Sequence, residues 1–300
     1  MRKLLFVVIT LLIVALCWYL FIKPSDFTVN FKVKTTPGTV IQTVKIWDYE
    51  LEDSKIIAQY GLDGLVQQRT FNDSVINYTY RFYEINDSIT KVSVGIKDLN
   101  NSLYNRITLP FTTTDFKTKN AQEITSFFEL LTTHLSQINV EVTGIEDSPA
   151  TYCAYISLKG LQREKAMGMM KNYGYIGDIL AANDVTFNGS PIVEITDWNV
   201  ENDSISYNFC FPIIQSENLP ITDEIKYKKL FPKKSIHAVY NGNYLTSDRA
   251  WYAILSYARK NNLDIEKKPI EVFFNNPNMG GNDLDWKADI YLPVVEKSAP

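Results

Sequence analysis

The segment PIEVFFNNP, Pro269–Pro277, is a short β-rich run between two prolines that closes with two asparagines. This composition predicts a strand followed by a turn. Because side chains alternate between the two faces of a strand, Glu271 shares a face with Phe273. A single carboxylate beside an aromatic ring either faces solvent or lines a pocket that receives a cation or a hydrogen-bond donor. The rest of the chain has to distinguish these two possibilities.

A β-α-β-β order of segments occurs twice around this strand. In the first copy we expect strands at Thr151–Gly160, Pro191–Asp197 and Ile205–Ile213 around a helix near Arg163–Leu180, and in the second copy strands at Ser235–Tyr244, Pro269–Phe274 and Trp286–Val294 around a helix near Ser247–Lys260. A Pro-Ile pair opens the middle strand of both copies. We therefore expect half-repeats of about residues 150–214 and 234–295 that form one antiparallel sheet with a cleft at their junction.

Three stretches of the second copy resemble a known family. They are YNGNYLTSDRAW at Tyr240–Trp251, KKPIEVFFNNP at Lys267–Pro277 and ADIYLPV at Ala288–Val294. Together they look like the GyrI-like small-molecule-binding domain, which is the effector-binding domain of many AraC- and MerR-type regulators. The resemblance covers roughly residues 140–295, and it departs from the family pattern at Asn276, where the family has an Asp.

The resemblance implies that Glu271 lies in an aromatic-lined cleft and receives cationic or amphipathic ligands. Ring faces would add cation–π attraction to such a site. The aromatic candidates near Glu271 in the sequence are Tyr240, Tyr244, Trp251, Phe273 and Tyr291. Two alternatives stay open: Glu271 lies on a solvated sheet face, or it pairs with Lys267 or Lys268. Aligning the two Pro-Ile pairs places Val193 opposite Glu271, so the first copy supplies no second acid at this point.

The N-terminus predicts a membrane anchor. Leu4–Ile22 contains no charged residue and is long enough to cross a bilayer. Arg2 and Lys3 precede it, and Trp18 and Tyr19 lie near its far end, where interfacial aromatics are expected. We expect residues 1–23 to form a single-pass transmembrane anchor with a cytoplasmic N-terminus and an extracytoplasmic body. A cleaved signal peptide is the alternative, although the apolar stretch is longer than a usual signal core.

Residues 24–139 predict a separate α+β domain. The expected elements are a strand at Asp26–Lys34, a helix at Thr39–Trp47, strands at Leu65–Phe71, Val75–Glu84 and Ile89–Lys97, and a helix at Asn120–Leu135. This order, with FKVKTTPGTVIQTVKIWD at Phe31–Asp48, resembles the START-like or SRPBCC (polyketide cyclase-like) helix-grip fold. The resemblance implies an apolar cavity between the sheet and its last helix, and a filled core is the alternative.

Composition excludes several classes of function. The formal net charge is −4 with a sequence pI near 5.4, and the chain has no long basic run, so nucleic acid is not expected as a partner. The two histidines, His134 and His237, and the two body cysteines, Cys153 and Cys210, form no metal-binding motif. We expect no metal and no cofactor, and either buried thiols or one disulfide. Residues 215–234 read as a solvated linker, and no protein partner is indicated.

These features predict a membrane-anchored small-molecule-binding protein that senses or sequesters an amphipathic or cationic ligand. An alternative is a hydrolase of the GyrI-like type, in which Glu271 and Tyr244 or Tyr240 act as an acid–base pair. A structural or protein-interaction role is the third possibility. Replacing the carboxylate of Glu271 distinguishes the first two, because an enzyme would lose turnover and a sensor would lose ligand affinity.

Overall fold

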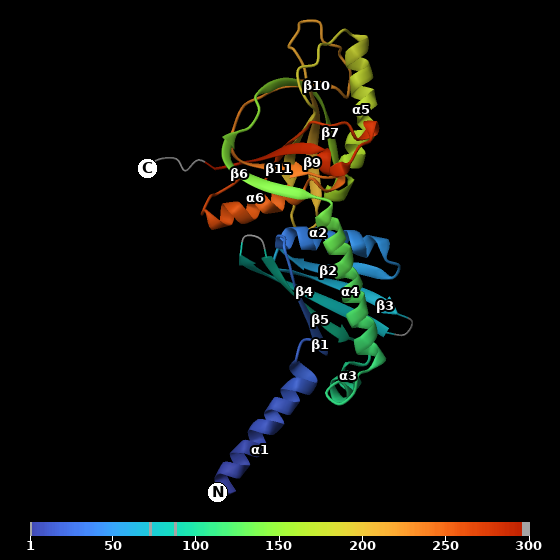
Figure 1. The fold of residues 1–300 in the computed structure, drawn as a ribbon, viewed down its shortest axis with the longest axis vertical. Coiled ribbons are helices and arrows are strands. Elements are labelled where there is room, and N and C mark those ends of the chain that lie inside the picture. Colours follow the sequence, from blue (N-terminus) through green and yellow to red (C-terminus); the bar gives the residue numbers. More distant parts are fainter. Residues whose placement is uncertain (1, 72–73, 87–88, 296–300) are drawn as a thin grey trace. The chain divides into compact units, whose positions relative to one another are not determined.

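The computed structural model describes residues 2–71, 74–86 and 89–295. The chain separates into two compact units, Met1–Thr132 and Thr133–Pro300, which we call unit 1 and unit 2. Each unit combines helices with an antiparallel sheet (Figure 1), which confirms the α+β class. The three-part division at residues 23 and 139 stays a prediction.

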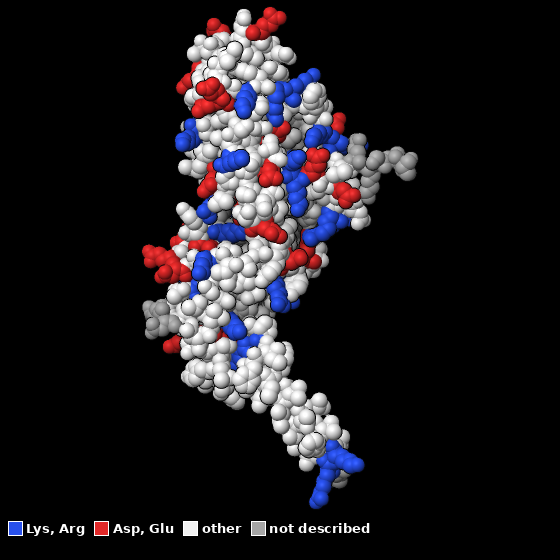
Figure 2. Space-filling view, turned by 180° about the vertical axis from the view of Figure 1, so that it is seen from behind, with Lys and Arg blue, Asp and Glu red and all other residues white. Residues whose placement is uncertain are grey.

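Unit 1 begins with the apolar helix. Helix α1, Arg2–Cys17, continues into the short π-helix η1, Trp18–Ile22, and neither contains a buried residue. Together they are 21 residues, and an 18-residue stretch within them has a mean hydropathy of 2.9. Figure 2 shows basic side chains at the free end of this helix and an otherwise uncharged surface along it. Length and composition therefore fit a membrane span, although a signal sequence near the N-terminus meets the same criterion.

The remainder of unit 1 is a five-stranded antiparallel sheet of order β1-β5-β4-β3-β2 with three helices. Its elements are β1 Phe27–Val33, α2 Pro37–Glu50, β2 Ser54–Tyr60, β3 Gly64–Phe71, β4 Ser74–Asn86, β5 Ile89–Asp98, α3 Ser102–Thr108 and α4 Asp115–Ser136. Helix α2 starts where expected because Thr36 caps it, accepting a hydrogen bond from the Thr39 backbone N–H at 3.4 Å, and Pro37 occupies the first turn.

Helix α4 packs its apolar stripe on this sheet. Phe127 contacts Tyr80 of β4, with ring centroids 6.1 Å apart, and Trp47 of α2, at 5.2 Å. The space between sheet and helix is therefore filled by aromatic rings at this point. A cavity of about 760 Å³ lies farther along, lined by residues of α4, α3 and strands β3, β4 and β5. Charged residues, including Asp98, Asp115 and Glu123, contribute to its wall, so it is not the purely apolar cavity that the START-like resemblance implies.

Unit 2 is an eight-stranded antiparallel sheet of order β10-β7-β9-β8-β12-β13-β11-β6. Its strands are β6 Asn139–Asp147, β7 Thr151–Leu161, β8 Ile192–Trp198, β9 Ser204–Pro212, β10 Lys226–Leu230, β11 Lys234–Asn241, β12 Ile270–Phe273 and β13 Lys287–Pro293, and its helices are η2 Gln162–Glu164, α5 Lys165–Ala182, η3 Tyr244–Thr246, α6 Arg249–Lys260, η4 Pro277–Met279 and η5 Asp283–Asp285. Strands β8 and β12 form the central pair, and Glu271 lies directly opposite Val193 in their register.

The expectation that residues 215–234 form a solvated linker is wrong in part. Lys226–Leu230 forms strand β10, which pairs with β7 at the sheet edge. Lys228 of this strand makes an ion pair with Glu194, so one of the basic side chains has a structural partner. Edge strands commonly carry lysines because charge discourages pairing with another chain. A lysine-rich edge strand consequently reads as a loop in the sequence.

Both body cysteines are free thiols with no exposed surface. Cys153 on β7 and Cys210 on the neighbouring β9 lie in one apolar cluster with Ile192, Leu230 and Ile270. The expectation of buried thiols holds in this structure. No group of three or more metal-ligating side chains occurs in the described parts of the chain.

His134 makes the stability of unit 2 depend on pH. It lies in the last turn of α4, its Nε2 has no hydrogen-bond partner among the described residues, and burial, assisted by the Arg249 charge, lowers its pKa from 6.5 to about 4. The unfolded chain therefore binds a proton between pH 6.5 and 4 that the folded chain does not, so stability falls as the pH drops through this window.

We expect His134→Leu to remove this dependence. The two pKa values differ by 2.5 (6.5 minus 4), which corresponds to at most about 3 kcal/mol of stability lost at the acid end. Urea unfolding at a series of pH values between 4 and 7 would measure the difference between the wild type and the variant. A difference that stays constant over this range would show that His134 is not the titrating group.

Candidate ligand-binding site

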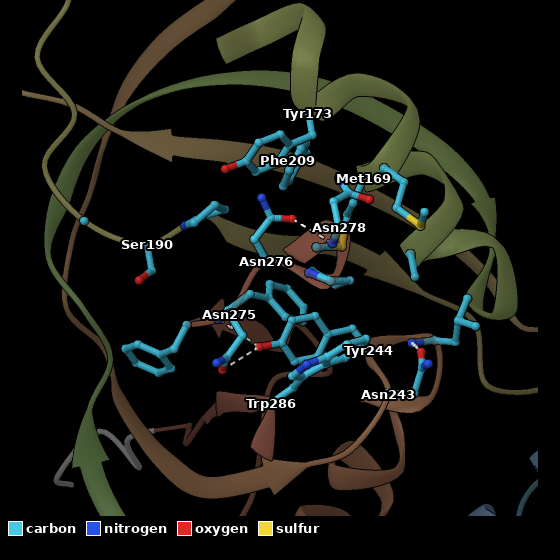
Figure 3. A pocket seen from close by; sticks show the side chains of 18 residues that line it. Met169, Tyr173, Ser190, Phe209, Asn243, Tyr244, Asn275, Asn276, Asn278 and Trp286 are labelled. Atoms are coloured by element: carbon cyan, nitrogen blue, oxygen red, sulfur yellow. Dashed lines mark hydrogen bonds between the residues drawn. The ribbon is translucent and has the colours of Figure 1, made fainter. Parts of the chain in front are cut away.

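A cavity of about 490 Å³ opens in unit 2 among α5, η3, β12 and the loop that follows β12 (Figure 3). Six aromatic residues line it: Tyr173, Phe209, Tyr244, Phe273, Phe274 and Trp286. The thioethers of Met169 and Met170 and the amides of Asn243, Asn275, Asn276 and Asn278 complete most of its wall. None of the lining residues that the structure describes carries a charge. The volume and this mixture are typical of a site for a small, largely apolar molecule.

The aromatic floor of the cavity is rigid. Tyr244 packs edge-on against Phe273 with ring centroids 4.7 Å apart, and its ring lies 5.8 Å from that of Trp286. The Tyr244 hydroxyl donates a hydrogen bond to the Lys287 carbonyl at 2.7 Å and accepts one from the Asn275 backbone N–H at 3.1 Å. Burial raises the pKa of Tyr244 above its usual range. The ring therefore stays neutral and fixed at physiological pH.

The turn before Tyr244 depends on Gly242. Its φ of 145° is unfavourable for other residues, and a side chain there would meet the Tyr240 hydroxyl oxygen at 2.7 Å. Asn243 then caps η3 by accepting a hydrogen bond from the Leu245 backbone N–H at 3.0 Å. This local geometry explains why the Gly-x-Tyr spacing singled out in the sequence places Tyr244 in the cavity wall.

The amides supply the polar part of the wall. The Asn276 side-chain oxygen accepts a hydrogen bond from the Asn278 backbone N–H at 3.1 Å. The Asn275 side-chain oxygen accepts one from the Lys287 backbone N–H at 2.8 Å. Figure 3 shows these hydrogen-bonded asparagines around the aromatic floor. Asn276 stands where the family pattern has an Asp, so this position contributes a neutral amide. The wall can consequently form hydrogen bonds with a ligand without favouring either sign of charge.

Glu271 lies behind this wall, fully buried, and is not among the residues that line the cavity. Its Oε1 accepts hydrogen bonds from Ser247 Oγ at 3.0 Å and Trp251 Nε1 at 2.9 Å. Its Oε2 forms an ion pair with the ammonium of Lys165, the first residue of α5. Both side chains of this pair are no more than 1% exposed. Glu271 therefore does not lie on a solvated face, and it pairs with neither Lys267 nor Lys268.

The groups around the Lys165 ammonium are the kind that bind cations. Its Nζ lies 4.6 Å from the centroid of the Trp251 ring and 6.0 Å from that of the cavity-lining Phe273. It also donates a hydrogen bond to Ser247 Oγ at 2.9 Å. A carboxylate, a hydroxyl and two aromatic faces thus surround an ammonium that belongs to the chain itself. A cationic ligand would have to displace this covalently attached charge.

The six residues expected at the site have four different placements. Tyr244 and Phe273 line the cavity, whereas Trp251 and Glu271 lie in the buried layer behind it. Tyr240 is buried, and its hydroxyl donates a hydrogen bond to the Asn243 carbonyl at 2.7 Å. Tyr291 stacks on His237 with centroids 4.6 Å apart and does not line the cavity. The expected set therefore includes two wall residues.

The acid–base pair of the hydrolase alternative is not assembled. The Glu271 carboxylate bonds to Lys165, Ser247 and Trp251, and the hydroxyls of Tyr244 and Tyr240 bond to backbone carbonyls. Burial raises the pKa of both tyrosines, which opposes their use as bases. These contacts hold each group in a structural role.

The sequence does not predict that Lys165 and most of the wall residues belong to the site. The one signal for Lys165 was its position at the start of an apolar helical run, AMGMM. Trp286 is the first residue of a predicted strand, and Tyr173 lies in the helix predicted for the first copy. Nothing in the sequence indicates that these residues meet.

Unit 2 thus has a sheet with a cavity lined by uncharged aromatic and amide groups, a lining that is common in small-molecule sites. The model of the GyrI-like small-molecule-binding domain matches residues 143–295, about half of the chain, and the chain belongs to the GyrI-like family. This confirms the family predicted from the second copy.

Solved structures of similar fold share little sequence with this chain. The EcmrR C-terminal domain is 12% identical, with 53% of this chain and 99% of that chain covered and a TM-score of 0.43. SAV2435 bound to tetraphenylphosphonium is 12% identical, with 52% and 94% covered and a TM-score of 0.39. A hydrolase from Listeria innocua is 11% identical, with 52% and 92% covered and a TM-score of 0.34. No curated protein matches the chain.

Proposed function

We propose that the chain is a membrane-anchored protein that senses or sequesters an uncharged, amphipathic small molecule in the cavity of unit 2. This proposal rests on the neutral character of the cavity wall. The wall offers aromatic, thioether and amide groups, and the carboxylate behind it is already neutralised by Lys165. The cationic ligand expected from the sequence is therefore disfavoured, and the amphipathic one is retained.

The membrane part of the proposal rests on Arg2–Ile22, which is apolar, long enough to span a bilayer and without a buried residue. A single span with a cytoplasmic N-terminus stays our expectation, because Arg2 and Lys3 precede it. This arrangement would tether unit 2 to a membrane, where amphipathic molecules are concentrated.

We also propose that unit 2 arose by duplication and that unit 1 is START-like. The strand order supports the duplication, because β8 and β12 are central, β9 and β13 flank them, and β7 and β11 follow on each side. The five-stranded sheet of unit 1 and the contact of Phe127 on α4 with Tyr80 of this sheet are in keeping with a helix-grip arrangement.

A matched set of probes tests the charge preference. Triphenylphosphine oxide, tetraphenylphosphonium and tetraphenylborate have similar shapes and are neutral, cationic and anionic. We expect the full chain in lipid nanodiscs to bind the neutral probe most tightly, measured by quenching of tryptophan fluorescence, with empty nanodiscs as the background for partitioning. Tightest binding of tetraphenylphosphonium would contradict a neutral site.

Tyr173→Ala should weaken the binding of triphenylphosphine oxide about tenfold, because it removes one aromatic wall worth about 1.4 kcal/mol. Tyr175→Ala is the matched control. Both tyrosines lie on α5 and are 38% and 41% exposed, and Tyr175 does not line the cavity. Equal affinities in the two variants would show that the ligand binds elsewhere.

A further inference from the structure

Helix α3 of unit 1 has the reverse of the polarity expected in a water-soluble domain. Its polar residues Asn105 and Arg106 face inward and are 3% and 2% exposed. Its apolar residues Leu103, Tyr104 and Ile107 face outward and are 46%, 66% and 51% exposed. Surface helices normally bury the apolar stripe and expose the polar one. The outer face of α3 is therefore built for apolar surroundings.

The sequence on both sides of α3 is also poor in charge. Arg106 is the one charged residue between Asp98 and Asp115, and it points into the protein. Phe111, in the turn after α3, is 84% exposed. We call the side chains of Leu103, Tyr104, Ile107 and Phe111 the α3 patch. Contiguous apolar side chains on a surface generally mark a site of contact with a membrane or a partner.

Partly buried hydrogen bonds of Arg106 join α3 to the end of the apolar N-terminal helix. The Arg106 guanidinium donates to the carbonyls of Leu20 at 3.0 Å and Lys23 at 2.6 Å. The Tyr19 hydroxyl donates to the Arg106 carbonyl at 3.1 Å. Arg106 thereby satisfies carbonyls at the end of the helix that have no partner within it. The structure thus fixes α3 beside η1.

The last turn of the N-terminal helix is equally apolar on its outside. Trp18, Phe21 and Ile22 are 51%, 68% and 69% exposed. Because α3 contacts η1 through Arg106, these side chains and the α3 patch belong to one region of unit 1. A bilayer that receives the helix would meet both.

We propose that the α3 patch inserts into the interfacial region of the same lipid bilayer that the N-terminal helix spans. The proposal rests on the membrane anchoring proposed above. Two observations favour lipid over a protein partner: the patch adjoins an apolar segment with the length of a membrane span, and Arg106, the charged residue of α3, is buried in an ion pair with Asp26. An amphipathic segment at this depth gains from burying its apolar face, and tyrosine is favoured there.

Depth-dependent fluorescence quenching tests the insertion. The full chain carrying Cys17→Ser would be reconstituted in phosphatidylcholine vesicles with Phe111→Cys or Ile107→Cys labelled by an environment-sensitive fluorophore. Cys153 and Cys210 are buried and stay unlabelled. Lipids with a nitroxide close to the headgroup should quench these labels at least about threefold more than a label on the soluble part of unit 1.

Tyr60→Cys supplies that control. Tyr60 is 62% exposed and lies at the β2–β3 turn, paired with Gly64, whereas α3 follows Asp98 at the other end of the strands, where Asp98 pairs with Ile76. Its label should emit as in water and be quenched by soluble iodide. The two labels differ in position but not in chemistry.

The outcomes separate the two proposals. Protein that is released from the vesicles by alkaline carbonate would overturn the anchoring itself. Protein that stays in the vesicles, with Phe111 and Ile107 labels quenched no more than the Tyr60 label, would overturn the insertion alone. Shielding that disappears on dilution with lipid would assign the patch to a second copy of the chain and would also overturn insertion.

Discussion

Lys165→Ala should destabilise unit 2 by about 3–5 kcal/mol, because it leaves the buried Glu271 carboxylate without its counter-charge. The pair is no more than 1% exposed, so solvent cannot replace the lost ammonium. Ser247 and Trp251 still donate hydrogen bonds to the carboxylate, but they carry no charge. Urea unfolding followed by tryptophan fluorescence would measure the loss.

The same variant should acquire a cation site. Truncation opens a space the size of a propylammonium ion between the Trp251 ring, the Phe273 ring and the Glu271 carboxylate. We expect propylammonium to restore a large part of the lost stability, and 1-propanol of the same length to restore little, because the carboxylate and the ring faces attract a positive charge. Wild type should respond to neither compound.

Two further variants serve as controls for this interpretation. Lys228→Ala breaks the ion pair between Lys228 and Glu194, whose side chains are 25% and 22% exposed, and should cost about 1 kcal/mol or less without response to propylammonium. Lys165→Met combined with Glu271→Leu should cost less than Lys165→Ala, since an apolar pair leaves no buried charge. A loss below about 1 kcal/mol in Lys165→Ala, with no rescue, would mean that Lys165 does not neutralise Glu271.

The sequence predicts the periodic elements of the fold well. Strands β7, β9, β12 and β13 and helices α4 and α6 lie within a few residues of their expected positions, because each buries one face of a regular pattern. The sequence predicts neither strand β10 nor helix α3, and the reasons are opposite. KYKKL at Lys226–Leu230 is too charged to indicate a strand, and α3 exposes the apolar face that periodicity assigns to the core.

The candidate site shows a different limit. Strand alternation correctly places Glu271 and Phe273 on one face, because that relation is local. The neutralising Lys165 lies more than one hundred positions away, and only the packing of α5 brings it to Glu271. Proximity in sequence also suggested Tyr291 and Tyr240, whose contacts depend on the sheet face and the turn that tertiary structure selects. Long-range pairing is therefore what the sequence alone does not provide.

Asp26→Asn should destabilise unit 1 by about 3–5 kcal/mol and loosen the end of the N-terminal helix. The Asp26 and Arg106 side chains are 0% and 2% exposed, and Arg106 Nε lies 2.9 Å from Asp26 Oδ1. The other oxygen accepts the Asp98 backbone N–H at 2.9 Å. Asparagine keeps the shape of this residue but leaves the guanidinium buried without a counter-ion, and its amide nitrogen cannot replace an acceptor.

Hydrogen exchange identifies which residues lose stability in Asp26→Asn. Because Arg106 also holds the carbonyls of Leu20 and Lys23, faster exchange in Asp26→Asn should reach residues 19–26 as well as the Asp98 amide. Glu266→Gln makes the same carboxylate-to-amide change in an exposed pair with Lys233, whose side chains are 42% and 50% exposed, and should cost less than about 1 kcal/mol. Faster exchange at Asp98 alone would mean that the backbone carbonyls suffice to hold Arg106, and that the ion pair supports the sheet but not the junction with the apolar helix.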